Sequence, residues 1–218
     1  MRPHVAFDHI RLSDASGNVD EAAFMRFAQE LWNEDRTRLT VLIDPGRIKR
    51  EVATNLELGP ALLASEQYTL AVEGGWPSAD GATVLSTFTR TFQVSDPLRT
   101  RPDASLWNAN APCAGTREPL TIELDRPFDR HLLMQTLRVV TEAGAAINGV
   151  IDVRDAEHQW SFTPYQPWSL EDLSLVANPI LEDVAGNNFR DLLDHVAGSS
   201  DIAPSVTNLQ ISIEDCAG

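Results

Sequence analysis

The chain has 218 residues, of which 43% are hydrophobic, so it is long enough for one large domain or two small ones with buried cores. Its 32 acidic and 17 basic residues give a formal net charge of −15, which argues against nucleic acid or an anionic membrane surface as a partner, because such binding needs a basic surface. No apolar run approaches the ~20 residues of a membrane span. The start of the chain shows no signal peptide, which taken alone predicts a cytoplasmic protein.

The two cysteines, Cys113 and Cys216, are too few for a disulfide framework. One bond between them is an alternative, but Cys216 lies two residues from the end of the chain, where fraying is expected. We therefore predict two free thiols.

The first half contains short runs of β-forming residues separated by turn residues. Four of these runs predict strands, at 7–12, 38–43, 68–72 and 88–94. Residues 24–32 fit either a helical face or a bulged strand. Residues 56–64 predict a short helix that Gly59-Pro60 interrupts.

The second half begins after a proline-rich stretch at 95–118 with little apolar periodicity, which predicts a linker. Six further runs predict strands, at 120–124, 137–140, 149–153, 159–162, 173–177 and, weakly, 189–196. Short strands with turn signals every eight to twelve residues or so predict an all-β sandwich fold. The chain lacks the long helices between strands that an α/β fold would need.

The two halves also echo each other in order. Residues 38–45, 68–72, 76–81 and 88–94 parallel residues 159–164, 173–177, 181–186 and 189–196. We therefore predict domains at 1–96 and 117–200, a linker at 97–116 and a tail at 201–218. The β-forming run at 206–213 of the tail belongs to neither repeat. It predicts an extra strand that pairs with an exposed sheet edge, in the same chain or in a second copy.

Three motifs of the second half occur together over about residues 117–197: Arg126-Pro127-Phe128-Asp129, Trp160-Ser161-Phe162-Thr163-Pro164 and Leu181-Glu-Asp-Val-Ala-Gly-Asn187. In this combination the segment resembles the S-layer-type bacterial Ig-like domain. The Gly-x-Tyr of that family is replaced by Glu171-Asp172-Leu173, which removes an aromatic residue near the corner of the fold.

The first half resembles the domain that precedes it in bacterial two-domain proteins of unknown function. The matching segments are Asp8-His9-Ile10-Arg11-Leu12, Glu30-Leu31-Trp32, Arg38-Leu39-Thr40 and Asp44-Pro45-Gly46-Arg47-Ile48-Lys49-Arg50. This resemblance implies two tandem Ig-like β-sandwich domains, the first without its first strand. Because such proteins are usually exported, it also implies a location in the periplasm or at the cell surface.

The loop from Leu181 to Asn187 carries the chemistry of a tight turn, since Gly186 tolerates positive φ and Asp183 can accept backbone N–H groups. The alternative is a calcium site formed by Asp183, Glu182 and Asn187, although calcium binds six to eight oxygens or so. The parallel segment of the first half keeps only one carboxylate, Asp80, which favours the turn.

Two further groups are candidate binding residues. Arg47, Lys49 and Arg50 form the one basic cluster, which is either a solvated loop or a contact for an anion or an acidic partner. Trp76 and Trp168 occur in predicted loops, where they either pack beneath the loops or stack on sugar rings.

No catalytic constellation is evident. The five histidines lack metal-ligand spacing, and the sequence has no nucleophile elbow, phosphate-binding loop or dinucleotide fingerprint. We therefore expect a non-catalytic Ig-like structural or interaction module of the bacterial cell envelope, with no cofactor and with a protein or glycan partner. The alternatives are a carbohydrate-binding or enzyme-accessory module that uses the loop tryptophans, and an enzyme whose clustered carboxylates line a cleft.

Overall fold

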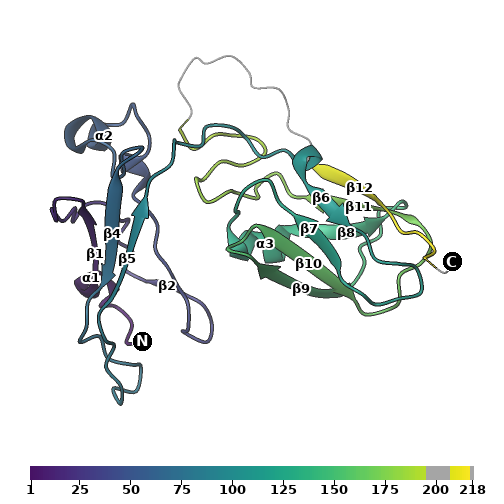
Figure 1. The fold of residues 1–218 in the computed structure, drawn as a ribbon, viewed down its shortest axis with the longest axis horizontal. Coiled ribbons are helices and arrows are strands. Elements are labelled where there is room, and N and C mark those ends of the chain that lie inside the picture. Colours follow the sequence, from purple (N-terminus) through teal and green to yellow (C-terminus); the bar gives the residue numbers. More distant parts are fainter. Residues whose placement is uncertain (195–206, 217–218) are drawn as a thin grey trace. The chain divides into compact units, whose positions relative to one another are not determined.

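The computed structural model describes residues 1–194 and 207–216. In these residues most of the regular structure is strand, paired antiparallel in several sheets, so the all-β prediction is confirmed. The chain divides into two compact units, Met1–Pro97 and Leu98–Gly218, each with its own buried core (Figure 1). Among the described residues, no helix has the length and hydrophobicity that a membrane span requires.

The first unit is built on a three-stranded sheet in the order β1-β4-β5, beside a separate β2-β3 hairpin. Its elements are α1 (Ala6–His9), β1 (Ile10–Asp14), β2 (Leu31–Trp32), β3 (Leu39–Thr40), η1 (Pro45–Arg47), α2 (Ala53–Leu58), β4 (Gln67–Val72) and β5 (Phe88–Gln93). The ambiguous segment 24–32 is not helical and instead forms β2 and a bridge from Phe24 to Ile43. Helix α2 ends before Gly59, whose φ of 74° no other residue type adopts as easily.

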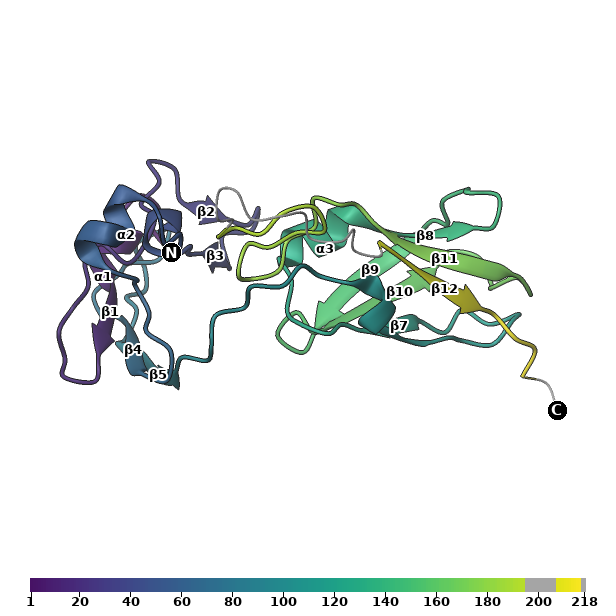
Figure 2. The same cartoon turned by 90° about the horizontal axis from the view of Figure 1, so that it is seen from above.

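The second unit has two antiparallel sheets, β6-β7-β10-β9 and β12-β11-β8. Its elements are η2 (Ala104–Leu106), β6 (Asn108–Asn110), β7 (Leu120–Glu123), α3 (Arg130–Thr136), β8 (Leu137–Thr141), β9 (Gly149–Arg154), β10 (Gln159–Pro164), β11 (Asp172–Ala177) and β12 (Asn208–Ser212). The two sheets lie on opposite sides of one core, which takes Ile122 and Trp160 from the first and Val139 and Leu175 from the second (Figure 2).

The predicted linker at 97–116 is wrong for most of its length, because these residues belong to the second unit. Strand β6 extends the sheet beyond β7, and Trp107 is 3% exposed. The Trp107 ring packs edge-on against Phe128 and Phe189 at centroid distances of 5.7 and 6.0 Å. A three-residue strand and one large anchor leave no periodic signal in the sequence, which is why the segment resembles a linker.

The prediction of two free thiols is also wrong, since Cys113 and Cys216 form a disulfide with their Cα atoms 5.4 Å apart. The expected fraying does not occur, because β12 pairs with β11 through Ser212. Beyond the strand, the amide of Ala114 donates to the carbonyl of Glu214 at 2.9 Å. These contacts bring the two cysteines together.

The sheet β1-β4-β5 of the first unit has a counterpart in β8-β11-β12 of the second. Each first strand follows a short helix and ends in a Gly-containing loop. Four hydrogen bonds from a backbone N–H to a backbone carbonyl recur in matching places of the two units. In the first unit they run from Asp20 to Leu12 (2.9 Å), Glu73 to His9 (2.7 Å), Arg2 to Pro77 (2.8 Å) and Val94 to Glu66 (2.9 Å). In the second unit, in the same order, they run from Ile147 to Val139 (2.9 Å), Asn178 to Thr136 (3.1 Å), Asp129 to Glu182 (2.9 Å) and Ile213 to Glu171 (3.2 Å). The predicted repeat is therefore present in this sheet.

Strand β12 occupies in the second sheet the place that β5 occupies in the first. Tyr68 pairs with Phe92, as Leu173 pairs with Ile211. The tail strand is thus part of the repeat, contrary to the prediction, and it pairs within its own chain. The predicted parallel of 88–94 with 189–196 is wrong over 189–194, which form no strand, and residues 195–196 lie outside the described part of the chain.

Candidate functional site

The loop from Leu181 to Asn187 is a closed turn around the fully buried side chain of Asp183. Its Oδ1 accepts the amides of Ala185 and Asn187, both at 2.9 Å. The amide of Gly186 donates to the carbonyl of Asp183 at 2.9 Å, and Gly186 has a φ of 82°. These contacts confirm the predicted turn. The positive φ explains why a glycine occupies position 186, since glycine adopts this conformation without steric cost.

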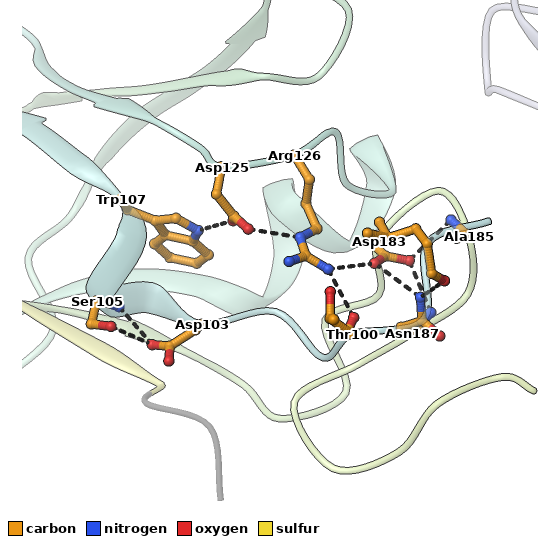
Figure 3. A network of polar contacts seen from close by, with 10 residues as sticks. Thr100, Asp103, Ser105, Trp107, Asp125, Arg126, Asp183, Ala185 and Asn187 are labelled. Carbon is orange, nitrogen blue, oxygen red and sulfur yellow. Dashed lines mark hydrogen bonds and ion pairs between the residues drawn. The ribbon is translucent and has the colours of Figure 1, made fainter. Parts of the chain in front are cut away.

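A charged network continues from this loop (Figure 3). The Arg126 guanidinium bridges two carboxylates, with Nε 2.7 Å from Asp125 Oδ2 and Nη1 3.3 Å from Asp183 Oδ2. Nη1 also donates to the carbonyl of Thr100 at 2.8 Å, and Asp125 Oδ1 accepts the indole N–H of Trp107 at 2.9 Å. Because the side chains of Asp125 and Arg126 are only 12% and 11% exposed, water screens these interactions weakly.

Asn187 fastens the loop to the beginning of the second unit. Its Nδ2 donates to the carbonyl of Leu98 at 3.0 Å, and its Oδ1 accepts the amide of Leu193 at 3.1 Å. Together with the contact from Arg126 to Thr100, this anchors the first residues after the unit boundary. The arrangement holds chain segments in place and presents no nucleophile with an adjacent base.

The contacts of this loop argue against the predicted calcium site at Asp183, Glu182 and Asn187. Both oxygens of Asp183 already accept hydrogen bonds, and a guanidinium lies where a metal cation would have to bind. The Asn187 amide oxygen accepts a backbone amide, and Glu182 contributes its carbonyl to the amide of Asp129 at 2.9 Å. Within residues 1–194 and 207–216, no group of three or more His, Cys, Asp or Glu side chains is placed to hold a metal.

The same turn occurs a second time, at Asp14 in the first unit. Asp14 Oδ1 accepts the amides of Ser16 and Asn18, both at 2.9 Å, and Gly17 has a φ of 84°. Hydrogen bonds from the Asn18 side chain and backbone lower the pKa of this exposed carboxyl. Sequence analysis missed this match, although Asp14-Ala-Ser-Gly-Asn18 shares its Asp, Gly and Asn with the loop at Asp183.

Neither candidate tryptophan offers a face to a sugar ring. Trp76 is 3% exposed, donates its indole N–H to the carbonyl of Arg2 at 2.8 Å and stacks on His9. Trp168 is 4% exposed and donates to the carbonyl of Glu118 at 2.8 Å. The packing interpretation is confirmed for both, and the sugar-stacking interpretation is wrong because both rings are covered.

The basic cluster does not act as one group, because Arg47 turns inward. Its side chain is 5% exposed, with Nη2 2.7 Å from Asp20 Oδ2 and Nε 2.6 Å from the carbonyl of Gly59. Lys49 is half-buried and Arg50 is exposed. Arg47 therefore ties the η1 turn to neighbouring loops, and the predicted three-residue anion contact loses its buried member.

A hollow of about 450 Å³ in the first unit contains a carboxylate that sequence analysis did not single out. It is lined by Pro3, His4, Gln29, Glu30, Trp32, Asn33 and Arg36. Burial opposes the ionisation of Glu30, but hydrogen bonds from the amide of Ala6 and the indole of Trp32, each at 2.7 Å, outweigh it and lower the Glu30 pKa. A carboxyl held ionised in this way is poorly suited to act as a general acid.

No known family model matches the chain, and no curated protein matches it either. Any functional interpretation therefore depends on the geometry of the two units. In that geometry the buried carboxylates Glu30 and Asp183 both fix the backbone of their own unit.

Proposed function

We propose that the chain is a non-catalytic module of two tandem Ig-like β-sandwich domains that serves a structural or interaction role in the bacterial cell envelope. The observation that carries the proposal is the repeated sheet, with matching registers and backbone hydrogen bonds in both units. Tandem copies of one sandwich suit a protein that spans distance or presents binding surfaces. The resemblance of residues 117–197 supports the Ig-like assignment.

The disulfide supports a location outside the cytoplasm. Bonds such as Cys113–Cys216 form and persist in oxidising compartments, whereas cytosolic thiols are kept reduced. The bond also joins two segments far apart in the sequence and so stabilises the folded state by restricting the unfolded chain, which suits a protein outside the cell. The acidic net charge favours a protein partner with basic residues.

The polar side chains support a role without catalysis. Asp183, Glu30 and Arg47 each hold backbone segments of their own unit in place. Trp76 and Trp168 are buried, so their rings are not available to stack on the sugar rings of a glycan partner. We therefore favour a protein partner.

Fractionation of source cells tests this proposal. Free thiols are alkylated before lysis, and the cysteine peptides are then measured by mass spectrometry in each fraction. We expect the protein in the periplasmic or surface fraction, with Cys113 and Cys216 protected from alkylation until a reductant is added. Recovery from the cytosol with both thiols alkylated would contradict the proposal.

A further inference from the structure

A second hollow of the first unit, of about 450 Å³, combines apolar and acidic side chains. It lies between the loop after β1 and the segment that follows α2, beside the start of β4. All its lining residues lie between positions 14 and 68, so the hollow involves neither end of the chain. Its apolar lining residues are Val19, Ala22, Leu58, Pro60, Ala61 and Tyr68.

These apolar side chains reach from the core to the surface. Ala61 and Tyr68 are 3% and 8% exposed and belong to the core cluster that includes Leu12. Val19 and Leu58 are 48% and 56% exposed. Because exposed apolar surface is unfavourable in water, an apolar side chain of a partner would gain stability by covering these two residues.

Arg47 holds the walls of the hollow in place. Its Nη1 and Nη2 lie 3.2 and 2.7 Å from the two carboxylate oxygens of Asp20, in the loop after β1. Its Nε and Nη2 donate to the carbonyls of Gly59 and Pro60, after α2, at 2.6 and 3.3 Å. A hollow whose walls are joined in this way needs little ordering when a ligand binds.

The described residues that line the hollow include three carboxylates and one cation. The carboxylates are those of Asp14, Asp20 and Glu21, and the cation is Arg47. Because Arg47 pairs with Asp20 and is 5% exposed, it does not balance the charges of the other two carboxylates. In the part of the chain that the structure describes, the Glu21 side chain makes no ion pair or hydrogen bond. The hollow therefore favours a cationic ligand.

The second unit carries no charge at the matching positions. Backbone hydrogen bonds after the first strand of the repeated sheet align the two loops residue by residue. They match Asp14 with Thr141, Asp20 with Ile147 and Glu21 with Asn148. The acidic hollow is therefore a difference between the two copies of the sheet, and the second unit is an internal control for binding.

We propose that this hollow binds an arginine side chain of a separate protein, flanked there by apolar residues. The flanking side chains cover Val19 and Leu58, and the guanidinium, which has donors for more than one carboxylate, contacts Asp14 and Glu21. The chain's own net charge of −15 opposes a second copy as the occupant. The proposal rests on the interaction role proposed above and names the surface and the chemistry of the partner.

A peptide titration of the 218-residue chain, followed by NMR, tests the proposal. The probe is acetyl-Leu-Arg-Leu-amide, and we expect saturable shifts of amide signals within residues 18–22 and 58–61 but none within the matching residues 145–148. Replacing the arginine of the probe with citrulline, which keeps the shape but not the charge, should weaken binding about tenfold or more. Replacing both of its leucines with glycine should weaken binding about fivefold or more.

Two variants of the chain, each with a matched control, test the two kinds of contact. Glu21→Gln should weaken binding of the probe about threefold, whereas Glu142→Gln, the same change in the matching loop of the second unit, should leave it unchanged. Leu58→Ser should weaken binding about fivefold. Leu56→Ser should not, because Leu56 lies on the same helix, is 74% exposed and does not line the hollow.

The proposal is overturned if the probe produces no saturable shift within residues 18–22 and 58–61. It is also overturned if the citrulline or glycine peptide binds as tightly as the probe, or if Glu21→Gln and Leu58→Ser bind it like their controls. Shifts of the same signals on diluting the chain alone would show that a second copy occupies the hollow, and would overturn it too. Because the thiol and fractionation experiment does not involve this hollow, failure of peptide binding is distinguishable from failure of the proposed function.

Discussion

Replacing Cys216 with serine is expected to lower the free energy of unfolding of the second unit by about 2–4 kcal/mol. The bond joins residues 103 positions apart and so restricts a large part of the unfolded chain. It also holds the end of β12 beside the segment that follows β6. Removing it frees a strand that contributes Ile211 to the core.

Urea unfolding, followed by hydrogen exchange so that each unit is read separately, measures this effect. Reducing the wild-type chain should reproduce the effect of Cys216→Ser in the second unit. Neither change should alter the first unit, which has no cysteine. Equal stability of the oxidised and reduced second unit would show that the strand contacts alone hold β12.

Replacing Asp183 with alanine is expected to cost about 3 kcal/mol of stability. The change removes one of two carboxylates from the buried side chain of Arg126 and leaves the amides of Ala185 and Asn187 without their acceptor. Buried donors and charges without partners carry a desolvation penalty. The anchoring of Leu98 and Thr100 should loosen as well.

Asp14→Ala is the matched control, because Asp14 makes the same turn hydrogen bonds at an exposed position. Water can replace the lost acceptor there, so its effect should be much smaller. Both variants are compared with the wild type by urea unfolding at neutral pH. If the two substitutions destabilised their units equally, the turn alone would account for the effect, and the network through Arg126 would contribute nothing.

Strand positions and turn residues could be predicted from the sequence, because alternation and turn chemistry are local properties. The strand at 173–177 and the turn at Asp183 belong to this class. The same local reasoning failed for residues 97–116, where β6 and Trp107 depend on partners elsewhere in the chain. It located the strand at 206–213 but missed its place in the repeat, because β12 comes later in the sequence than even spacing of the two copies suggests.

The candidate sites were harder to predict, since each depends on a tertiary partner. Arg126 lies 57 residues before Asp183, and only the fold shows that its guanidinium is the cation beside this carboxylate. Arg47 contacts Asp20, which lies 27 residues earlier in the chain. This contact buries a side chain that the sequence alone places in a basic surface cluster. Among the described residues the backbone of Val41 is unpaired, a difference that the sequence does not show and that only the pairing of its counterpart Trp160 with β7 reveals.

One three-stranded sheet, with its backbone hydrogen bonds, occurs in both units. Among the described residues, the backbone groups of Val41 and Ile43 are unpaired, whereas those of Trp160 and Phe162 in the second unit pair with β7. Residue-resolved amide hydrogen exchange of the 218-residue chain tests this correspondence most directly. The amides of Asp20 and Ile147 should both exchange slowly, because they make the same hydrogen bond in the two units.

At the strand of residues 39–43, we expect fast exchange of the Val41 and Ile43 amides and slow exchange of their counterparts, the Trp160 and Phe162 amides. Slow exchange at Val41 and Ile43 in the monomeric chain, equal to that at Trp160 and Phe162, would contradict this correspondence.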